Sequence, residues 1–326
     1  MTSRATIIGT GSCLPRRILS NQELETIVET TDEWITTRTG IKNRRIGRSG
    51  EETSKLAAGA ARQALEMAGL VATDLDQIIV ATVTSEMTMP SCACLVQKEL
   101  GATRAFAYDV NAACSGFVYG LDLAEKYIRA EPDLKILVIG AETMSTRINW
   151  QDRNTCVLFG DGAGACIVTG NNSGRGMLAS QLYSDGRLFD LLKINCAASM
   201  NPDLSLADHD GSYIQMAGRD VFKYAVRSME KAASIVLDKT NLDISDVKLI
   251  IPHQANIRIL KSLADHLGTS LEKVYINLDK YGNTSAASVP IALDEANREG
   301  CLQENDLLLL CCFGGGFTWG AMMFRW

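Results

Sequence analysis

The amino-acid sequence predicts an α/β protein composed of two related halves. Short runs rich in Val, Ile and Leu alternate with amphipathic segments of helical length along the 326 residues. Many strand-like runs are apolar throughout, which is typical of strands covered by helices on both faces of a sheet. A similar order of elements recurs after roughly 170 residues, which indicates an internal duplication.

Hydrophobic periodicity gives the position of each expected element. The expected strands are Thr6–Ile8, Gln77–Thr82, Ala105–Asp109, Lys135–Ile139, Cys156–Leu158, Ala165–Val168, Lys248–Ile251, Lys273–Ile276 and Leu307–Cys312. The expected helices are Ser54–Ala68, Ser91–Leu100, Ser115–Arg129, Val221–Leu237, Arg258–Leu267 and Ser288–Arg298.

The duplication rests on landmarks that keep their order and approximate spacing. In the first half, DLDQIIVATVTS leads through a helix ending in KELG to YDVNAACSG and a further helix. In the second half, DISDVKLIIPHQA leads through a helix ending in ADHLG to NLDKYGNTSAAS and a further helix. We therefore predict an N-terminal half at 1–172 and a C-terminal half at 173–326.

Composition excludes several classes of protein. Apolar residues make up 46% of the chain, which is ample for a buried core, and the formal net charge is −6. A negative balance repels nucleic acid and anionic membrane surfaces, so any basic site must be local. Because we find neither a signal-peptide pattern nor a run approaching the roughly 20 apolar residues of a membrane span, we expect a cytoplasmic protein without nucleic-acid or membrane partners.

The sequence offers no convincing site for a metal or a dinucleotide. The ten cysteines indicate reduced thiols, and the pairs Cys92/Cys94 and Cys311/Cys312 lack the second Cys or His pair of a zinc site. The glycine-rich stretch Gly160–Ala165 lies between apolar strand-like runs with no helix after it, unlike an NAD-binding fingerprint. We expect no cofactor.

Cys114 is the candidate nucleophile. It follows a predicted strand, in the small-residue turn of DVNAACSGFVY, and lies where the next helix starts. The positive end of a helix favours a thiolate, and small neighbours leave room for a substrate carbonyl. Taken alone, Cys114 fits a buried core thiol better than a nucleophile.

His253 is the candidate partner among three histidines. It follows the apolar strand Lys248–Ile251 and precedes a helix, a strand-end position of the kind that carries function. A loop histidine without a catalytic role is the alternative. His209 lies in a polar loop and His266 beside an aspartate in mid-helix, where we expect solvated surface.

Asn283 and a run of three glycines complete the set. Asn283 lies in the turn of YGNTSAAS before a helix, where Asn is also an ordinary capping residue. At the duplication offset it falls within a residue or two of the counterpart of Cys114, so the two helix starts should converge on one site. Gly314, Gly315 and Gly316 follow an apolar strand, and form either a plain turn or a loop that aims an N–H at a thioester oxygen.

These motifs together resemble the β-ketoacyl-[acyl-carrier-protein] synthase III family of the thiolase superfamily, the initiating condensing enzymes of type II fatty-acid synthesis. The resemblance covers essentially the whole chain. Its motifs are TDEWITTRTGIKNRRI, AACSGF around Cys114, FGDGAGA, PHQANIRI around His253, GNTSAAS around Asn283 and the terminal GGGFTWG.

The resemblance implies a thiolase-like five-layer αβαβα fold, a homodimer and a decarboxylative condensation. Cys114 would accept a short acyl group from acyl-coenzyme A, with the N–H groups of Cys114 and Gly315 at the oxyanion. Malonyl-acyl-carrier protein would then lose carbon dioxide, and neutral His253 and Asn283 would donate to the enolate.

The same resemblance implies the binding residues. Trp34 and Arg153 would sandwich the adenine of coenzyme A, and the further coenzyme A contacts would be Arg38, Gly218, Phe222 and Asn256. Each of these residues could instead have a purely structural role; Trp34, for example, could be a core residue. Three basic residues would form a local patch for an acidic carrier protein, unless they are ordinary solvated surface: Lys223, Arg258 and Lys261.

Met89 lies where family members carry a residue, often Phe, that crosses the dimer interface and lines the acyl pocket. A flexible thioether admits a longer or branched primer more readily than a rigid ring. Three other readings remain open: a condensing enzyme or acyltransferase of secondary metabolism with the same Cys–His–Asn set, a catalytically silent synthase subunit, and a papain-like hydrolase. The intact Cys–His–Asn set argues against a silent subunit, and the duplicated α/β pattern argues against a hydrolase.

Overall fold

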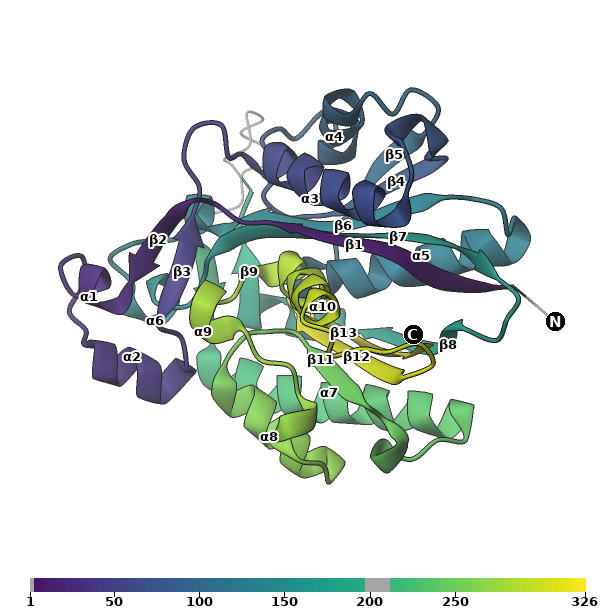
Figure 1. Cartoon of the computed structure of the whole chain (residues 1–326). Helices are drawn as coiled ribbons and strands as arrows, with labels where there is room; N and C mark the ends of the chain where they lie inside the picture. Colours follow the sequence, from purple (N-terminus) through teal and green to yellow (C-terminus); the bar gives the residue numbers. More distant parts are fainter. Residues whose placement is uncertain (1–2, 197–211) are drawn as a thin grey trace.

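The computed structural model describes residues 3–196 and 212–326, in which two mixed sheets lie between three layers of helices (Figure 1). The first sheet has the strand order β1-β7-β6-β4-β5, and its strands are β1 (Arg4–Cys13), β7 (Asp161–Asn171), β6 (Ile136–Thr143), β4 (Gln77–Ala81) and β5 (Phe106–Val110). The second has the order β11-β12-β13-β8, and its strands are β11 (Leu249–Pro252), β12 (Leu307–Gly314), β13 (Thr318–Arg325) and β8 (Gly176–Ser184).

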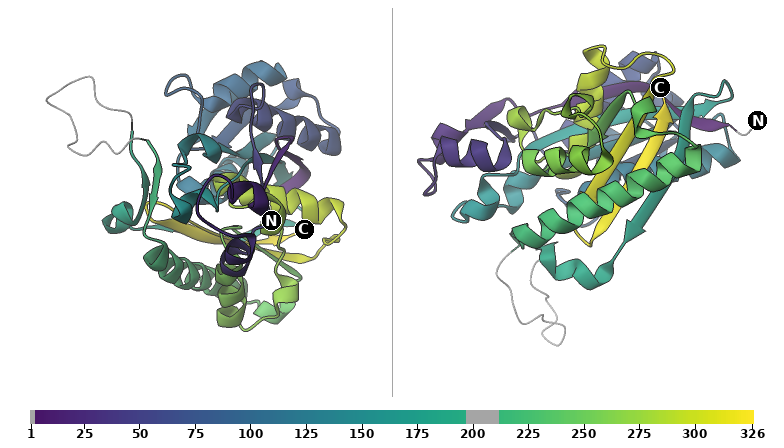
Figure 2. Two further views of the ribbon diagram at one scale, coloured as in Figure 1. Left: turned by 90° about the vertical axis from the view of Figure 1, so that its left-hand side faces the viewer. Right: turned by 90° about the horizontal axis from the view of Figure 1, so that it is seen from below.

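The helices fill the layers above, between and below the sheets. Helices α3 (Thr53–Ala68) and α4 (Cys92–Leu100) cover the outer face of the first sheet. Helices α5 (Gly116–Ala130) and α10 (Ser288–Arg298) lie between the sheets. Helix α7 (Gly218–Thr240) runs across the outer face of the second sheet, beside α8 (Ile257–Leu267), as the right-hand view of Figure 2 shows. The five-layer αβαβα prediction is thus confirmed.

The two sheets repeat one topology. In the first, β4 runs parallel to β5 and β6, while β7 runs antiparallel to both β6 and β1. In the second, β11 runs parallel to β12, while β13 runs antiparallel to both β12 and β8. The halves are therefore related, and the predicted boundary after residue 172 falls in the connection between β7 and β8.

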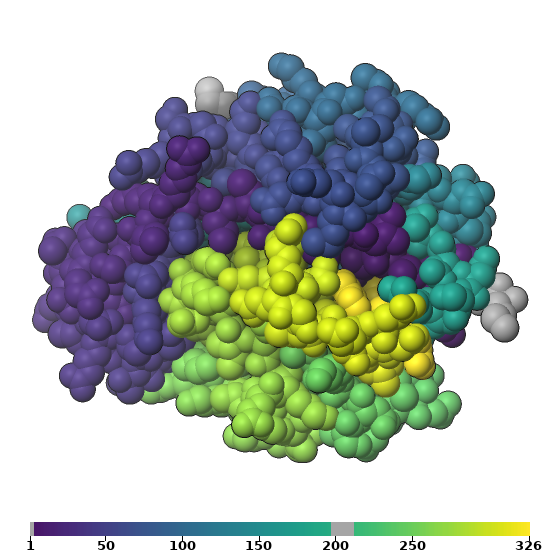
Figure 3. Space-filling model, viewed as in Figure 1, coloured from purple at the N-terminus to yellow at the C-terminus, as the bar shows by residue number. Residues whose placement is uncertain are grey.

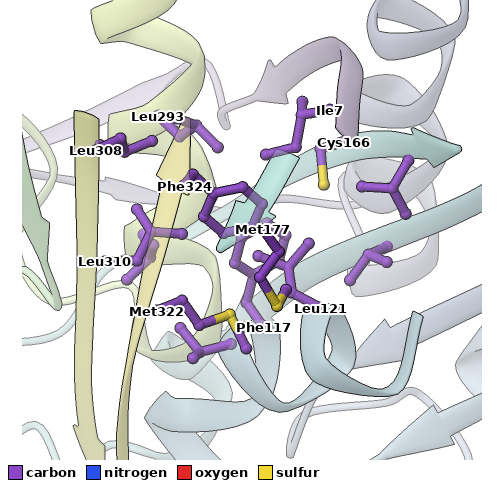
Figure 4. Close-up of a cluster of buried hydrophobic side chains, with 14 of the residues drawn as sticks. Ile7, Phe117, Leu121, Cys166, Met177, Leu293, Leu308, Leu310, Met322 and Phe324 are labelled. Carbon is purple, nitrogen blue, oxygen red and sulfur yellow. The ribbon is translucent and has the colours of Figure 1, made fainter. Parts of the chain in front are cut away.

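Three apolar clusters hold the layers together. The central one packs α5 and α10 between the sheets, with Phe117, Leu121, Leu293 and Phe324 at most 1% exposed (Figure 4). The other two pack α3 and α4 on the first sheet and α7 and α8 on the second. The N-terminal turns of both middle helices are consequently buried and held in place between the sheets.

Two predicted strands are wrong. Cys156–Leu158 is not a strand, because Cys156 ends the short helix α6 (Arg153–Cys156) and the chain then turns. Lys273–Ile276 forms only one parallel bridge, between Val274 and Ile250, at the place where the second sheet would carry its counterpart of β5. Short apolar runs look alike whether they lie in a strand, a helix end or a buried loop. The predictions did not include β8, whose residues are mostly half-buried, or β13, which follows the glycine turn.

An N-terminal insertion forms a flank at one end of the layers. It contains the hairpin of β2 (Arg17–Ser20) and β3 (Asn43–Ile46), with α1 (Asn21–Leu24) and α2 (Asp32–Thr39) between these strands. The Thr31 hydroxyl accepts from the Trp34 N–H at the start of α2. Helix α2 packs on α8, and β3 packs on α9 (Leu278–Tyr281), so the insertion lies against the C-terminal half (Figure 3).

The remaining short strands β9 (Leu192–Ile194) and β10 (Ile214–Met216) pair with each other beside this flank. Among the residues that the structure describes, no helix is both long enough and apolar enough to cross a membrane. His209, which we expect to lie on the surface, falls outside the described residues.

Candidate active site

A cavity of about 630 Å³ opens where the two halves meet. Its wall contains Cys114 from the first half and His253, Asn283 and Gly315 from the second. The apolar side chains that line the cavity include Leu192, Met216, Phe222 and Phe313. The three residues predicted for catalysis therefore share one cavity, although 169 residues separate the first from the last.

Cys114 lies in a 3-10 turn, Ala113–Ser115, that joins β5 to α5. Ala113 has φ 47°, a left-handed conformation that costs energy for a non-glycine residue and is found mainly where packing enforces it. That packing comes from β12: a Cβ on Gly314 would lie 2.7 Å from the Cys114 nitrogen, so only glycine fits there. The Thr318 hydroxyl lies 2.8 Å from the Ala112 carbonyl and 3.1 Å from the Gly315 carbonyl, and so holds both loops together.

The Cys114 thiol is buried, and burial raises its pKa to about 12, even though a hydrogen bond from Ser285 favours the thiolate. The nearby charge of Glu142 raises this pKa further. The sequence suggests a pKa lowered by the start of α5, but here the cost of desolvating the thiolate is the larger effect. The resting nucleophile is therefore a thiol whose proton must be removed during the reaction.

His253 directly follows β11, and its backbone N–H donates to the Cys311 carbonyl at 2.8 Å. Burial lowers the pKa of His253 to about 4, so the ring is neutral at physiological pH. Its Nδ1 lies 2.6 Å from the Ser288 hydroxyl, which also accepts from the Gln254 N–H. Among the described residues, the Ser288 hydroxyl has no acceptor other than His253 Nδ1. The hydroxyl therefore donates to Nδ1, and the ring hydrogen of His253 lies on Nε2.

Asn283 is held by its backbone and by its side chain. Its N–H donates to the Leu158 carbonyl at 2.8 Å, and its carbonyl accepts from the Gly160 N–H at 3.0 Å. Its Oδ1 accepts from the Ser285 N–H at 2.9 Å. This bond fixes the orientation of the amide and leaves Nδ2 as a donor at the cavity wall.

The duplication relates the turn of Cys114 to a turn after Asn283. The second turn is Ser285–Ala287, and Ser285 has φ 51°, so it repeats the conformation of Ala113 172 residues earlier. Ala286 is then the counterpart of Cys114, and Asn283 precedes this counterpart by three residues. The predicted offset of one or two residues is thus slightly wrong, while the predicted convergence on one cavity is confirmed.

The oxyanion donors that the sequence suggests lie next to each other. The close approach of Gly314 to the Cys114 nitrogen brings the glycine loop against the turn. Within the described part of the chain, the N–H groups of Cys114 and Gly315 have no backbone carbonyl partner. They are therefore available to an oxygen in the cavity.

The residues predicted for coenzyme A fall into two groups. Gly218, Phe222 and Asn256 line the cavity. Trp34, Arg38 and Arg153 lie in the N-terminal flank, with the guanidinium carbons 5.3 Å (Arg38) and 4.7 Å (Arg153) from the Trp34 ring centroid. An aromatic base between Trp34 and Arg153 would require a separation of about 7–8 Å, two van der Waals contacts. One of the two side chains must therefore move before a base can enter.

Besides Trp34, Arg38 and Arg153, four further predicted residues do not line the cavity. Lys223, Arg258 and Lys261 are exposed, and the first two are sequence neighbours of Phe222 and Ile259 on the cavity wall. Met89 is 86% exposed, whereas Thr88 beside it does reach the cavity. Within residues 3–196 and 212–326, no group of three or more His, Cys, Asp or Glu could hold a metal ion. As expected, Gly160–Ala165 runs straight into β7, without a helix.

Sequence reasoning missed the residues that hold the site in shape. Ser288 contacts His253 and Thr318 contacts Gly315 through their hydroxyls, while Ser285 donates its backbone N–H to Asn283. Glu142 is fully buried behind Ser285 and accepts from the Ser285 hydroxyl. Both serines lie in GNTSAAS, so aligning the two halves residue by residue would have drawn attention to Ser285.

A duplicated five-layer fold with Cys, His and Asn around one cavity defines a condensing enzyme of the thiolase fold. Two family models for 3-oxoacyl-[acyl-carrier-protein] synthase III match the chain, one over residues 108–186 and the C-terminal one over 237–326. The chain belongs to the β-ketoacyl-[acyl-carrier-protein] synthase III family.

Individual relatives agree over the full length. The β-ketoacyl-[acyl-carrier-protein] synthase III of Desulfotalea psychrophila is 56% identical over 320 residues, which cover 98% of this chain and 99% of the relative. The crystal structure of the Aquifex aeolicus synthase III is 48% identical, with a TM-score of 0.93 over 99% of this chain and 100% of its own. The priming β-ketosynthase of the R1128 polyketide pathway is 34% identical, with a TM-score of 0.91 over 99% and 97%.

Proposed function

We propose that the chain condenses a short acyl group from acyl-coenzyme A with malonyl-acyl-carrier protein, giving 3-oxoacyl-acyl-carrier protein, coenzyme A and carbon dioxide. This reaction would initiate fatty-acid synthesis. The observation that supports it most is the meeting of Cys114, neutral His253 and Asn283 at one cavity. A catalytically silent subunit would have no use for all three residues.

In the first half-reaction, the Cys114 sulfur attacks the thioester carbonyl of acyl-coenzyme A. The negative charge that develops on the carbonyl oxygen needs donors that are already in place. The N–H groups of Cys114 and Gly315 suit this role because Gly314 packs its loop against the turn. Collapse of the tetrahedral intermediate releases coenzyme A and leaves an acyl-cysteine.

In the second half-reaction, malonyl-acyl-carrier protein loses carbon dioxide and leaves an enolate of its thioester. His253 Nε2–H and Asn283 Nδ2–H would stabilise the enolate oxygen as neutral donors, so neither residue has to ionise. The carbanion attacks the acyl-Cys114 carbonyl and forms the carbon–carbon bond. Because decarboxylation itself generates the carbanion, the chemistry requires neither a metal nor a redox cofactor.

Coenzyme A would extend from the cavity to the N-terminal flank. Phe222, Gly218 and Asn256 line the path that its pantetheine arm would follow. At the surface, Trp34 and Arg153 would separate to take the adenine between them, with Arg38 beside them. We propose that Lys223, Arg258 and Lys261, close to this opening, contact the acidic carrier protein.

We also propose a cytoplasmic homodimer, with neither nucleic acid nor membrane as a partner. Strand β5 is an edge of the first sheet, and Phe106 at its start is 51% exposed, which suits pairing with a second copy. Exposed Met89 would then reach the acyl pocket of the second subunit. The molar mass in solution, measured by light scattering, tests the dimer. The natural protein should have twice the mass of one chain, and Phe106→Asp should have the mass of a single chain.

The release of carbon dioxide from malonyl-acyl-carrier protein tests the function. We expect release and 3-oxoacyl product only when an acyl-coenzyme A is present, and competition among acetyl-, isobutyryl- and octanoyl-coenzyme A would rank the primers. A strict acetyl preference would refute the role given to Met89. Acyl transfer without carbon dioxide release would point to a transferase of secondary metabolism, and a strong preference for a polyketide carrier protein would favour a priming role like that of the R1128 relative.

A further inference from the structure

Behind the cavity wall lies a carboxyl group that the proposed mechanism does not use. Glu142, near the end of β6, is fully buried, and its carboxyl accepts four hydrogen bonds, from Thr82, Val83, Thr84 and Ser285. No cation pairs with it in the part of the chain that the structure describes. A buried carboxylate without a cation is costly, so a purely structural role is a poor explanation for it.

Ser285 links this carboxyl to the nucleophile. Its hydroxyl donates to Glu142 Oε1 at 3.0 Å, and Ser285 lines the same cavity as Cys114, with the turns Ala113–Ser115 and Ser285–Ala287 packed against each other. A hydroxyl has one proton, so while it donates to ionised Glu142 it can only accept from the Cys114 S–H. Ser285 is therefore placed between the thiol and the carboxylate, where it can accept one proton while it gives up another.

We infer that Ser285 and Glu142 form a proton relay that removes the thiol proton when Cys114 attacks acyl-coenzyme A, and this inference rests on the proposed function. The Cys114 proton passes to Ser285 Oγ while the Ser285 proton passes to Glu142 Oε1. The sulfur forms its bond to the acyl carbon, and the carbon–sulfur bond to coenzyme A breaks. The proton then returns through Ser285 to the leaving coenzyme A thiolate, so Glu142 ends the half-reaction ionised.

Electrostatics favours this route over loss of the proton to solvent. Burial raises the pKa of Glu142 to about 7 and raises that of Cys114, and the charge of Glu142 disfavours ionisation of Cys114. Once Glu142 is ionised, the pair holds one negative charge, and the relay moves this charge without adding a second. Cys92 on α4 is the other thiol near Glu142; burial and nearby carboxylates keep it un-ionised, because its pKa is raised far above neutrality. Ser285 is then a catalytic residue, and Glu142 is a positioning residue that acts through it.

The rate of Cys114 acylation as a function of pH tests the relay. Mixing the whole protein with acetyl-coenzyme A, quenching, and measuring intact mass gives this rate directly. In the natural protein we expect it to rise with pH and level off near neutrality, as Glu142 ionises. In Glu142→Gln the levelling should disappear, because only direct ionisation of the thiol remains, and the rate at pH 7 should fall by about 10²-fold.

Three further variants make the result specific. Glu125→Gln is the matched control, because Glu125 is an equally buried glutamate on α5 with no link to Ser285, and its profile should match the natural one. Ser285→Ala should reproduce the Glu142→Gln profile, and the double variant should be no slower than either single one. Glu142→Asp, which keeps a carboxyl, should retain a levelling profile at a lower rate, even if Glu142→Gln does not fold.

The possible outcomes separate this relay from the proposed function. If the natural protein gains no acyl group, the proposed function fails and the relay fails with it. If the natural protein is acylated but Ser285→Ala and the folded Glu142 variants keep its rate and pH profile, the relay alone is overturned.

Discussion

At the scale of single residues, Asn283 has the most sharply defined role. Its Oδ1 is occupied by the Ser285 N–H, so the amide can only donate into the cavity. We predict that Asn283→Ala lowers decarboxylation by about 10²–10³-fold, the usual loss for one preorganised donor, and leaves acylation of Cys114 within a few-fold. Stopped-flow decarboxylation and intact mass measure the two steps separately. Asn297→Ala, at the far end of α10, is the control, and equal losses in both steps would contradict the role.

Ser288 should act on the same step through His253. Without its hydroxyl, Nδ1 has no donor, and the ring can shift its hydrogen from Nε2 to Nδ1. We predict that Ser288→Ala lowers condensation about 10-fold without slowing acylation. Nitrogen NMR of the three histidines should show His253 protonated at Nε2 in the natural protein. A resting Nδ1–H form would rule this explanation out.

The residues show what a sequence can and cannot predict about a site. Cys114, His253 and Asn283 stand in short motifs at strand ends and helix starts, so their positions were predictable. The pKa of Cys114 was not, because the helix start is visible in sequence while the extent of burial is not. Glu142 and Ser285 were missed for the same reason, since their link depends on β6 lying beside a turn 143 residues away.

At the scale of elements, the packing of β12 against the Cys114 turn fixes both the nucleophile and the oxyanion donors. A methyl group on Gly314 would lie 2.7 Å from the Cys114 nitrogen and 3.0 Å from that of Ser115, so the turn would have to move. We predict that Gly314→Ala destabilises the protein by about 1–3 kcal/mol and slows acylation more than 10-fold. Denaturant unfolding and intact mass measure the two effects.

The control for that variant is Gly186→Ala, because an added Cβ there meets nothing within 4 Å. It should change neither stability nor acylation by a comparable amount. If Gly314→Ala is acylated at the natural rate, the turn does not need its present position.

Most elements of the layers were predictable, because long periodic helices and fully apolar strands give strong signals. The errors at Cys156–Leu158 and Lys273–Ile276 come from runs of three or four residues, too short for a period to show. Strand β8 was missed because its residues are mostly half-buried and do not form an apolar run. Tertiary pairing with β13, rather than local preference, makes it a strand.

At the scale of the whole molecule, two buried groups at the cavity should give stability opposite dependences on pH. The folded pKa of His253 is about 4 against 6.5 for a free histidine, so the unfolded chain binds more protons and stability falls as pH drops from 6.5 to 4. The folded pKa of Glu142 is about 7 against 4.5, so stability is lost as pH rises from 4.5 to 7. Each difference corresponds to something on the order of 3 kcal/mol.

Chemical denaturation between pH 4.5 and 7.5 checks both signs. Relative to the natural protein, His253→Gln should gain stability as pH falls, and Glu142→Gln should gain stability as pH rises. A stability difference that does not change with pH for either variant would show that the substituted group does not titrate as described.

The central claim for the molecule is that one cavity, shared by both halves, carries the acyl group on Cys114 and then transfers it to carbon. The most direct measurement is the intact mass of the protein, first with acyl-coenzyme A and then after addition of malonyl-acyl-carrier protein. We predict a single acyl adduct that Cys114→Ala lacks, that malonyl-acyl-carrier protein removes within turnover time, and that persists in Asn283→Ala. An adduct that forms in Cys114→Ala, or one that malonyl-acyl-carrier protein leaves in place on the natural protein, would contradict the claim.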